Sequence, residues 1–323
     1  MKGFLGIDVG SVSTNLVVID ENNEVLVSLY IRTRGQPIKA VQDGLKQVAA
    51  EVGESFSILG VGTTGSARHL TSVLVGADSE KNEITAHAVA ASAMVPGVQT
   101  VLEIGGQDSK IILLRQGVVT DFAMNTVCAA GTGSFLDQQA ARLNIPIEDF
   151  GGLSLQSQVT TRIAGRCSVF AESDMIHKQQ LGHNLEDIVS GLCEALVRNY
   201  LNNVGKGKEI ISPVVFQGGV AANVGIKVAF ERALGQEVII PKYFNVMGAI
   251  GAAILARDAV KKTKQTNFKG FDAGGFKYRA GSFECKDCSN LCEVIEIFQD
   301  QQVIARWGDR CGKWSNMKIE SVL

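Results

Sequence analysis

Three glycine-rich stretches, each directly after a predicted strand, contain the residue types that hold a nucleotide. In the first, Gly10 and Ser11 offer backbone N–H groups to a phosphate, and Ser13 and Thr14 add hydroxyl donors. Asp8, just before this turn, can hold Mg²⁺ through water. Phosphoryl transfer needs this combination, because donors must surround the phosphates while a metal ion bridges them. The stretch therefore predicts one half of a magnesium–nucleotide site.

The other two stretches supply the remaining parts of such a site. Gly105 and Gly106 precede Gln107, which can position the attacking water, and Asp108, a second carboxylate directed at Mg²⁺. The third stretch places glycines at a helix start, where a base or ribose can lie on the backbone. Its binding residues are Gly218, Gly219, Val220 and Asn223. We therefore expect an ATP cleft with Asp8, Gln107 and Asp108 as its catalytic residues.

Each stretch alone is a weak signal, because a strand followed by such glycines is more often only a turn. Three in this order, two of them related by a repeat, are much stronger. The stretch 62–68 has two glycines but lacks the lysine of a Walker A loop. No Rossmann Gly-x-Gly-x-x-Gly follows the first predicted strand either. The nucleotide site is therefore expected to belong to neither of these classes.

The chain repeats one pattern of strands, which predicts two similar α/β halves. Aligning Leu5 with Leu102 also places Ile7 on Ile104, and in both copies a glycine turn follows the first strand. The repeated strands are expected at 3–9, 15–20 and 25–31, and again at 101–104, 110–114 and 118–123. Further strands are expected at 58–61, 210–216 and 238–240, and helices at 37–52, 80–94, 131–143, 184–203 and 246–258. Two phosphate-holding hairpins should then face each other across a cleft.

Two of the seven cysteines lie where chemistry is plausible. Cys128 comes just before a predicted helix start at Gly131, Thr132 and Gly133, and Cys167 precedes another predicted helix. The positive end of a helix stabilises a thiolate or an anionic cluster. An isolated cysteine is more often a small buried apolar residue, and we keep that interpretation for Cys193.

The motifs identify a family by resemblance. The chain is similar to the activator ATPases, or archerases, of 2-hydroxyacyl-CoA dehydratases and benzoyl-CoA reductases (the BadF/BadG/BcrA/BcrD type). That family lies within the superfamily of acetate and sugar kinases, heat-shock chaperones and actin. The resemblance covers about residues 3–258, and its motifs are 6–11, 102–108, 128–135, 167–173 and 216–221. It implies the duplicated ribonuclease H-like, actin-like α/β fold.

The resemblance also implies a redox function. It makes Cys128 and Cys167 the ligands of a 4Fe–4S cluster and makes the chain an ATP-driven, one-electron donor of low potential. A cluster needs about four thiolates, so two per chain predict a symmetric homodimer with the cluster on its axis. The expected acceptor is an iron–sulfur protein, either a dehydratase or a double-cubane protein. Ferredoxin or flavodoxin is the expected reductant, and 131–133 are expected to move with the nucleotide.

The C-terminal segment departs from the family pattern. Cys285, Cys288, Cys292 and Cys311 have the spacing of a four-thiolate site, for which zinc is the default and a second iron–sulfur cluster the sharper alternative. Unligated thiols remain a third reading. Residues 294–304 predict a small hairpin within this module. We therefore expect three units: a first subdomain at 1–95, a second with the cluster cysteines and the last helix at 96–260, and linker plus module at 261–323.

Composition excludes several classes of function. The 323 residues include 31 Lys and Arg against 33 Asp and Glu, so no basic field predicts nucleic-acid binding. No apolar run approaches the length of a membrane span, and the first residues enter a strand without a predicted leader. Cysteines in such a protein are expected to be reduced or metal-bound. We therefore expect a cytoplasmic protein that binds neither membrane nor nucleic acid.

Two other functions stay open at the level of sequence. The first is a small-molecule kinase on the same fold, which would need a catalytic Asp in its sugar cleft and would make Cys128 and Cys167 incidental. The second is a nucleotide-dependent protein switch without redox chemistry. Colour distinguishes the redox activator from a kinase. An iron–sulfur activator purified without oxygen is brown and bleaches with dithionite, whereas a kinase is colourless.

Overall fold

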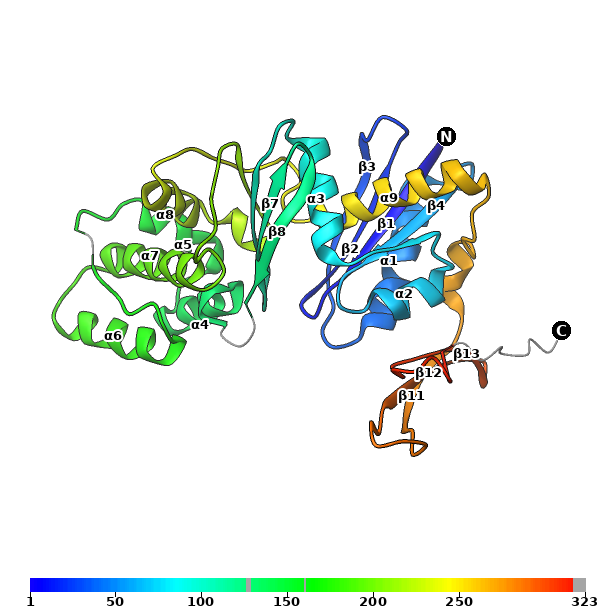
Figure 1. Cartoon of the computed structure of the whole chain (residues 1–323). Coiled ribbons are helices and arrows are strands. Elements are labelled where there is room, and N and C mark those ends of the chain that lie inside the picture. Colours follow the sequence, from blue (N-terminus) through cyan, green and yellow to red (C-terminus); the bar gives the residue numbers. More distant parts are fainter. Residues whose placement is uncertain (126–128, 160, 316–323) are drawn as a thin grey trace.

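Two lobes, each built on a five-stranded sheet, make up the body of the protein (Figure 1). The structure is a computed structural model, and it describes residues 1–125, 129–159 and 161–315. In lobe I the sheet has the order β3-β2-β1-β4-β5. Its strands are β1 (Lys2–Val9), β2 (Ser13–Ile19), β3 (Val25–Arg32), β4 (Ser57–Thr64) and β5 (Ser79–Glu80). β2 is antiparallel to β1 and β3, whereas β4 is parallel to β1.

Lobe II repeats this topology strand for strand, which confirms the duplication expected from the sequence. Its sheet has the order β8-β7-β6-β9-β10, with the same antiparallel pairs and the same parallel partner. The strands are β6 (Thr100–Ile104), β7 (Ser109–Arg115), β8 (Val118–Met124), β9 (Val214–Gln217) and β10 (Val238–Ile239). The strand predicted to begin at residue 210 begins later, because Pro213 has no N–H for the ladder.

Alternation of side chains decides what each face of the lobe I sheet meets. Leu5, Ile7 and Val9 pack with α1 (Pro37–Val52) and α2 (Arg68–Val75). Phe4 points the other way, into a core that contains Ala249 of α9 (Met247–Thr263). By the same alternation Asp8 projects toward α9, where it becomes available to the cleft.

Helix α9 lies against lobe I at backbone distance, which the sequence did not reveal. A Cβ at Gly6 would lie 1.8 Å from the carbonyl oxygen of Ala249, and one at Gly62 would lie 2.0 Å from that of Ala252. We expected this helix to belong to the second subdomain, 96–260. It packs on β1 and β4 of the first sheet, where small residues on both partners let the two backbones touch, and its apolar core also contains residues of β6, β7 and β9.

The remaining helices complete the two lobes. α3 (Glu83–Met94) packs on α9 and, in Figure 1, lies between the two sheets. Five helices pack around the large core of lobe II: α4 (Gly133–Leu143), α5 (Ile147–Ser154), α6 (Ser168–Gln180), α7 (Leu185–Asn203) and α8 (Val224–Leu234). The sequence analysis missed the short helices α2 and α5. In the described part of the chain, no helix is long and apolar enough to cross a membrane.

A small three-stranded sheet follows the body and is attached to lobe I. α9 continues to Thr263, so Lys261 and Lys262 are helical and the expected linker is shorter than predicted. A 3-10 turn at Phe271–Gly275 then packs on α1, and Gln42 donates a hydrogen bond of 2.7 Å to the carbonyl of Phe276. The sheet has the order β11 (Tyr278–Glu284), β12 (Glu293–Gln299) and β13 (Gln302–Trp307). β12 and β13 confirm the predicted hairpin.

The contact between β4 and α9 gives a direct test of this packing. We expect Gly62→Ala to reduce the free energy of unfolding by about 3 kcal/mol or more, because the new methyl group forces α9 away from the sheet. Gly152→Ala is the matched control, since a Cβ there meets open space within helix α5. The control should be neutral or stabilising by about 0.5–1 kcal/mol. Urea unfolding of both variants measures the difference, and equal stabilities would contradict the packing.

Candidate active site

The candidate site is a cleft between the lobes, at the ends of β1 and β6. The cleft has an empty volume of about 750 Å³ and opens to solvent. The predicted residues that line it are Asp8, Gly10, Ser11, Ser13, Gly105, Gly106, Gln107, Asp108, Gly218 and Gly219. A neighbouring cavity of about 1030 Å³ adds Gly133, Val220 and Asn223. The structure thus gathers residues from three separate stretches of the chain into one site.

The two glycine hairpins of the cleft are closed by equivalent backbone hydrogen bonds. Gly10 donates its N–H to the carbonyl of Ser13 at 2.8 Å, and Gly105 donates to that of Asp108 at 2.9 Å. The turns also meet, because a Cβ at Gly106 would lie 2.7 Å from Cγ2 of Val12. This arrangement confirms that equivalent turns of the two halves face each other across the cleft. Backbone N–H groups of such turns can surround a phosphate.

Asp8 is held in a narrow space between two glycines. A Cβ at Gly248 would lie 2.1 Å from Oδ2 of Asp8, and one at Gly65 would lie 2.6 Å from Oδ1. Burial and, to a smaller extent, the charges of Glu83 and Asp108 together raise the pKa of Asp8 to about 7, although Lys110 opposes them. A carboxylate in this position gains from a nearby cation, which lowers the cost of its charge.

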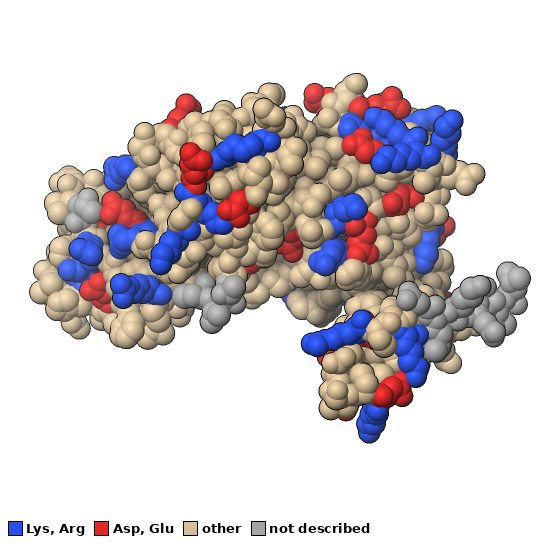
Figure 2. All heavy atoms as spheres, in the orientation of Figure 1, with Lys and Arg blue, Asp and Glu red and all other residues tan. Residues whose placement is uncertain are grey.

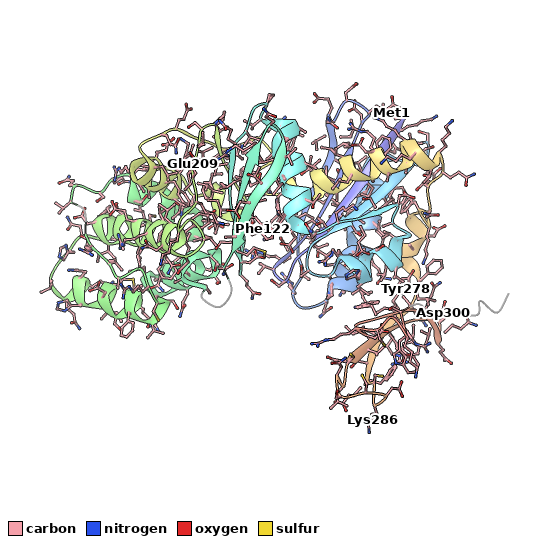
Figure 3. The ribbon with its side chains drawn as sticks, in the orientation of Figure 1. Met1, Phe122, Glu209, Tyr278, Lys286 and Asp300 are labelled. Carbon is pink, nitrogen blue, oxygen red and sulfur yellow. The ribbon has the colours of Figure 1, made fainter. Side chains whose placement is uncertain are left out.

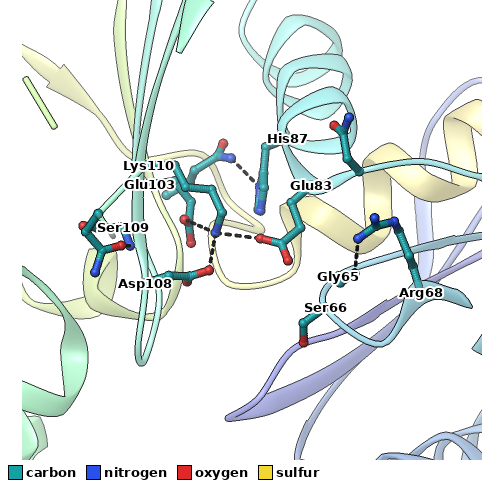
Figure 4. Close-up of polar contacts among 12 residues, drawn as sticks. Gly65, Ser66, Arg68, Glu83, His87, Glu103, Asp108, Ser109 and Lys110 are labelled. Carbon is teal, nitrogen blue, oxygen red and sulfur yellow. Dashed lines mark hydrogen bonds and ion pairs between the residues drawn. The ribbon is translucent and has the colours of Figure 1, made fainter. Parts of the chain in front are cut away.

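Lys110 of β7 connects carboxylates from both lobes (Figure 4). Its ammonium lies 2.8 Å from Glu83 of α3, 3.0 Å from Glu103 of β6 and 2.8 Å from Asp108. Burial by itself lowers the pKa of Lys110, but the three carboxylates outweigh burial and raise it, so Lys110 stays protonated. Burial raises the pKa of Glu103 to about 8 in spite of its contact with Lys110.

A neutral hydrogen bond joins the lobes beside this ion cluster. Nε2 of Gln217 on β9 lies 2.8 Å from Nδ1 of His87, one helical turn after Glu83 on α3. Burial and the charge of Lys110 lower the pKa of His87 to about 3, so the ring is neutral at physiological pH. The amide nitrogen can therefore donate to Nδ1. Glu83 and His87 together attach one face of α3 to lobe II.

The third glycine stretch, 218–223, lines another wall of the cleft and of the neighbouring cavity. Gly218 has φ +91° and lies so close to β6 that a Cβ would meet the carbonyl oxygen of Ile104 at 2.4 Å. Gly219 follows at the start of a 3-10 turn, with the hydroxyl of Tyr30 3.6 Å from its Cβ position. Asn223 caps α8 by accepting the N–H of Ile226 at 3.1 Å. The bare backbone leaves room for a flat base or a ribose.

The balance of charge in the cleft fits a divalent cation. Among the described residues of this cluster, the acidic side chains of Asp8, Glu83, Glu103 and Asp108 outnumber the single ammonium of Lys110, and a bound cation would favour the ionised forms of Asp8 and Glu103, whose pKa values burial raises. Carboxylates and water are the ligands that Mg²⁺ takes, and Mg²⁺ reaches protein sites together with phosphates. The residues present therefore fit a Mg²⁺–nucleotide complex, with Asp8 and Asp108 as the carboxylates nearest the phosphate hairpins.

Several predicted residues are placed elsewhere. The hydroxyl of Thr14 is buried and lies 2.9 Å from that of Thr33, within lobe I. Gly131 packs against Asn199, and the hydroxyl of Thr132 donates to the carbonyl of Ala129 at 2.7 Å. These three residues contact other parts of the protein and do not line the cleft.

The cysteines predicted to bind metal are only partly described. Cys167 is half-buried and is the N-cap residue of α6, whereas Cys128 lies outside the described residues. Cys193 is buried in α7, where burial raises its pKa to about 12. Within the described ranges, no three His, Cys, Asp or Glu side chains are gathered in a metal-binding group.

Sequence reasoning missed the central ion cluster, of which Glu83, Glu103 and Lys110 are members. Glu103 and Lys110 were read only as parts of strands. One usable signal was present, because Glu83 and His87 are four residues apart and so share a helix face. His87 lies at the boundary between the lobes, where it contacts Gln217.

Comparison with known proteins identifies the family. The BadF/BadG/BcrA/BcrD ATPase family matches residues 5–256, which include every residue of the cleft. The chain belongs to this family. The match ends before the small C-terminal sheet.

Relatives of known role support the assignment of this family member. The (R)-2-hydroxyglutaryl-CoA dehydratase activating ATPase of Acidaminococcus fermentans is 35% identical over 78% of this chain and 96% of its own length. The activator of 2-hydroxyisocaproyl-CoA dehydratase from Clostridium difficile, solved with bound ADPNP, has a TM-score of 0.73. It is 31% identical and covers 81% of this chain and 97% of that one. The ethanolamine utilization protein EutJ from Carboxydothermus hydrogenoformans, 18% identical with a TM-score of 0.51, shares the fold alone.

The raised pKa of Asp8 predicts a pH dependence of stability. The folded pKa of about 7 exceeds the ordinary value of 3.8, so between these values the native state binds more protons than the unfolded state. Asp8 should therefore contribute stability that the nucleotide-free protein loses as pH rises from about 4 to 7; the raised pKa of Glu103 acts in the same direction, and the lowered pKa of His87 opposes it below about 6.5. Asp8→Asn should reduce the slope by up to about 1 kcal/mol per pH unit.

Urea unfolding at several pH values measures this slope, and the exposed Glu21→Gln in the β2–β3 turn is the control. Adding Mg²⁺ and ADPNP should reverse the sign, because cation binding displaces the proton. A slope that Asp8→Asn leaves unchanged would remove Asp8 from the explanation.

Proposed function

We propose that this protein is an ATP-driven, low-potential electron donor whose homodimer carries one 4Fe–4S cluster. Cys128 and Cys167 of each protomer would hold the cluster, which supplies one-electron redox chemistry when bound. The acceptor would be an iron–sulfur protein of the dehydratase or double-cubane type, and ferredoxin or flavodoxin would be the reductant. The names of the relatives support this proposal, because several are activators of dehydratases.

The observation that carries the proposal is a direct link from the phosphate hairpin to the segment after Cys128. The N–H of Gly133 donates to the carbonyl of Gly105 at 2.9 Å, and that of Ser134 donates to Gly106 at 2.8 Å. Gly133 is the first residue of α4, so this helix starts on the hairpin that would hold the phosphates. A shift of the hairpin on nucleotide binding would move α4 and the chain just before it.

Asn199 of α7 contacts both of the segments that lie next to the cysteines. Its amide nitrogen donates to the carbonyl of Gly165, two residues before Cys167, while Gly131 packs against its Oδ1. Since Gly131 follows Cys128 by three residues, α7 holds both segments at one place. The described segments next to the two cysteines, 129–131 and 165–167, therefore lie together on lobe II.

The described thiol suits an iron ligand. Cys167 accepts an N–H from Ala171 at 2.9 Å through its own carbonyl, as an N-cap residue does, and its side chain is half-buried. The N-terminal end of α6 favours negative charge on this sulfur. Thiolates are the protein ligands of 4Fe–4S clusters, so the donor chemistry fits.

In the cleft, the residues of this chain would hold and hydrolyse Mg²⁺–ATP. Asp8 and Asp108 would orient the metal-bound waters, and Gln107 at the hairpin tip would orient the attacking water. Glu83, paired with Lys110 across the lobe boundary, would transmit closure of the cleft to α3. The loss of the γ-phosphate then changes the position of the 105–106 turn, to which α4 is attached.

Anaerobic purification tests the cluster. We expect brown protein with about four iron and four sulfide per dimer, bleached by dithionite. Cys167→Ser should lose the iron and remain folded, whereas Cys288→Ser in the C-terminal sheet is a matched control that keeps it. Colourless protein that consumes ATP in proportion to a small acceptor would support a kinase instead.

Nucleotide coupling can be tested without knowing the partner. With Mg²⁺–ATP, a soluble iron chelator should remove iron at least about tenfold faster than with Mg²⁺–ADP, since movement of α4 exposes the cluster. Asp108→Asn should abolish this difference while iron content stays normal. Equal rates with both nucleotides would contradict the coupling even if the cluster is present.

Gln107 has a role that kinetics can isolate. Gln107→Ala should reduce ATP turnover on the order of 100-fold, because the attacking water loses its positioning contact. ADPNP affinity and iron content should change little, since neither depends on this side chain. Gln116→Ala, in the β7–β8 turn, is the control. A normal turnover rate in Gln107→Ala would remove Gln107 from the mechanism.

A further inference from the structure

The small C-terminal sheet brings four cysteines to one of its ends. Cys285 follows β11 and Cys292 precedes β12, and the N–H of Cys285 donates to the carbonyl of Cys292 at 2.8 Å. These two residues therefore lie directly opposite each other, one step beyond the pair Glu284 and Glu293. Cys288 is in the loop between them. Three thiols are thus confined to one hairpin loop, 285–292.

The fourth cysteine reaches the same end because the chain folds back after β13. A Cβ at Gly308, which has φ +106°, would lie 2.4 Å from the carbonyl oxygen of Glu293. Farther along, Lys313 forms an ion pair with Asp287, and the ring of Trp314 meets Phe283 edge-on at 4.9 Å. Residues 308–315, which contain Cys311, are therefore packed beside the hairpin loop.

This end of the sheet has little apolar support. In the described part of the module after residue 276, Val294 and Ile297 are the only aliphatic side chains in the buried core. Figure 3 shows Lys286 at the tip farthest from lobe I, whereas Tyr278 lies at the junction, where its hydroxyl reaches the carbonyl of Leu74. Figure 2 shows the module projecting from the body. Units of this size that lack a core usually need a disulfide or a metal ion.

A second observation points to a missing acceptor at this end. The indole Nε1 of Trp314 is buried and has no hydrogen-bond partner among the described residues. A buried donor of this kind costs stability unless it is satisfied. Sulfur of a metal-bound thiolate is an acceptor for such groups, and donors around a site stabilise its charge.

The present contacts of the thiols show what ligation would change. Sγ of Cys285 lies 3.4 Å from Asp287, and Sγ of Cys311 lies 4.0 Å from Asp309. Cys288 and Cys311 are exposed, and no three ligand side chains of the described chain yet meet at one point. The backbone already brings these segments together. Rotation of the cysteine side chains would have to bring the four thiols to one point.

We infer that Cys285, Cys288, Cys292 and Cys311 bind one Zn²⁺ ion that fixes the end of the C-terminal sheet. Binding converts the four thiols to thiolates and releases their protons, so the site gains a net charge of −2. Lys286 and Arg310 flank the cysteines and offset part of that charge, whereas Lys313 is paired with Asp287. The site is separate from the proposed cluster, because it involves different cysteines on a different unit.

Zinc content of the full chain provides the first test. We expect about one equivalent of zinc per chain, falling by more than half in Cys288→Ser, whose side chain is exposed. Cys167→Ser is the matched control: it should lose iron but retain zinc, which separates this site from the proposed function. Full chain without zinc, or iron lost instead of zinc in Cys288→Ser, would overturn the inference.

Tryptophan fluorescence provides the second test, because Trp307 and Trp314 are the only two tryptophans of the chain and both are in this module. A strong zinc chelator should shift their emission and speed proteolysis within 285–292, and added Zn²⁺ should restore both. In Cys288→Ser the chelator should have no effect. Unchanged emission in the wild-type protein, or four cysteines found as disulfides after reduction-free purification, would refute a zinc site.

Discussion

The structure depends most on the buried ammonium of Lys110. It is almost fully removed from water, yet it stays charged because carboxylates from both lobes surround it. Glu103 and Asp108 belong to its own lobe, whereas Glu83 arrives on α3 from the other lobe. This cation therefore joins the lobes at the cleft, beside an apolar core to which strands of both lobes contribute.

Small residues make this arrangement possible. α9 touches the strands of lobe I at backbone distance, and the same helix places Gly248 against Asp8. Because Gly248 and Gly65 have no side chains, the backbone comes close to both carboxylate oxygens of Asp8 at the cleft. The turn at 105–106 is similarly bare, which allows it to contact Val12 on one side and the start of α4 on the other. Direct contacts therefore connect the 105–106 turn to Val12 of the other lobe and to the start of α4, which follows the first cysteine segment.

The C-terminal sheet is organised on other principles. The body is stabilised by three large apolar cores, whereas the module has few buried apolar side chains and many cysteines. It is fastened to α1 and α2 of lobe I through Gln42 and Tyr278, so it moves with that lobe. Its strands lie beyond the residues that the family model matches. A cross-link within the unit, such as a bound metal ion, can order it when its apolar core is too small to do so.

The sequence by itself determined the duplicated strands, the three glycine stretches and the hairpin of the C-terminal sheet, because these depend on local patterns of two to ten residues. It also identified the family, through motifs that the family match confirms. Only the tertiary structure decided that α9 packs on β1 and β4 and that Thr14 faces Thr33. It alone revealed the cluster around Lys110, whose members come from α3, β6 and β7. Side chains that meet across a lobe boundary share no spacing in the sequence, since their contact exists only after both lobes have folded.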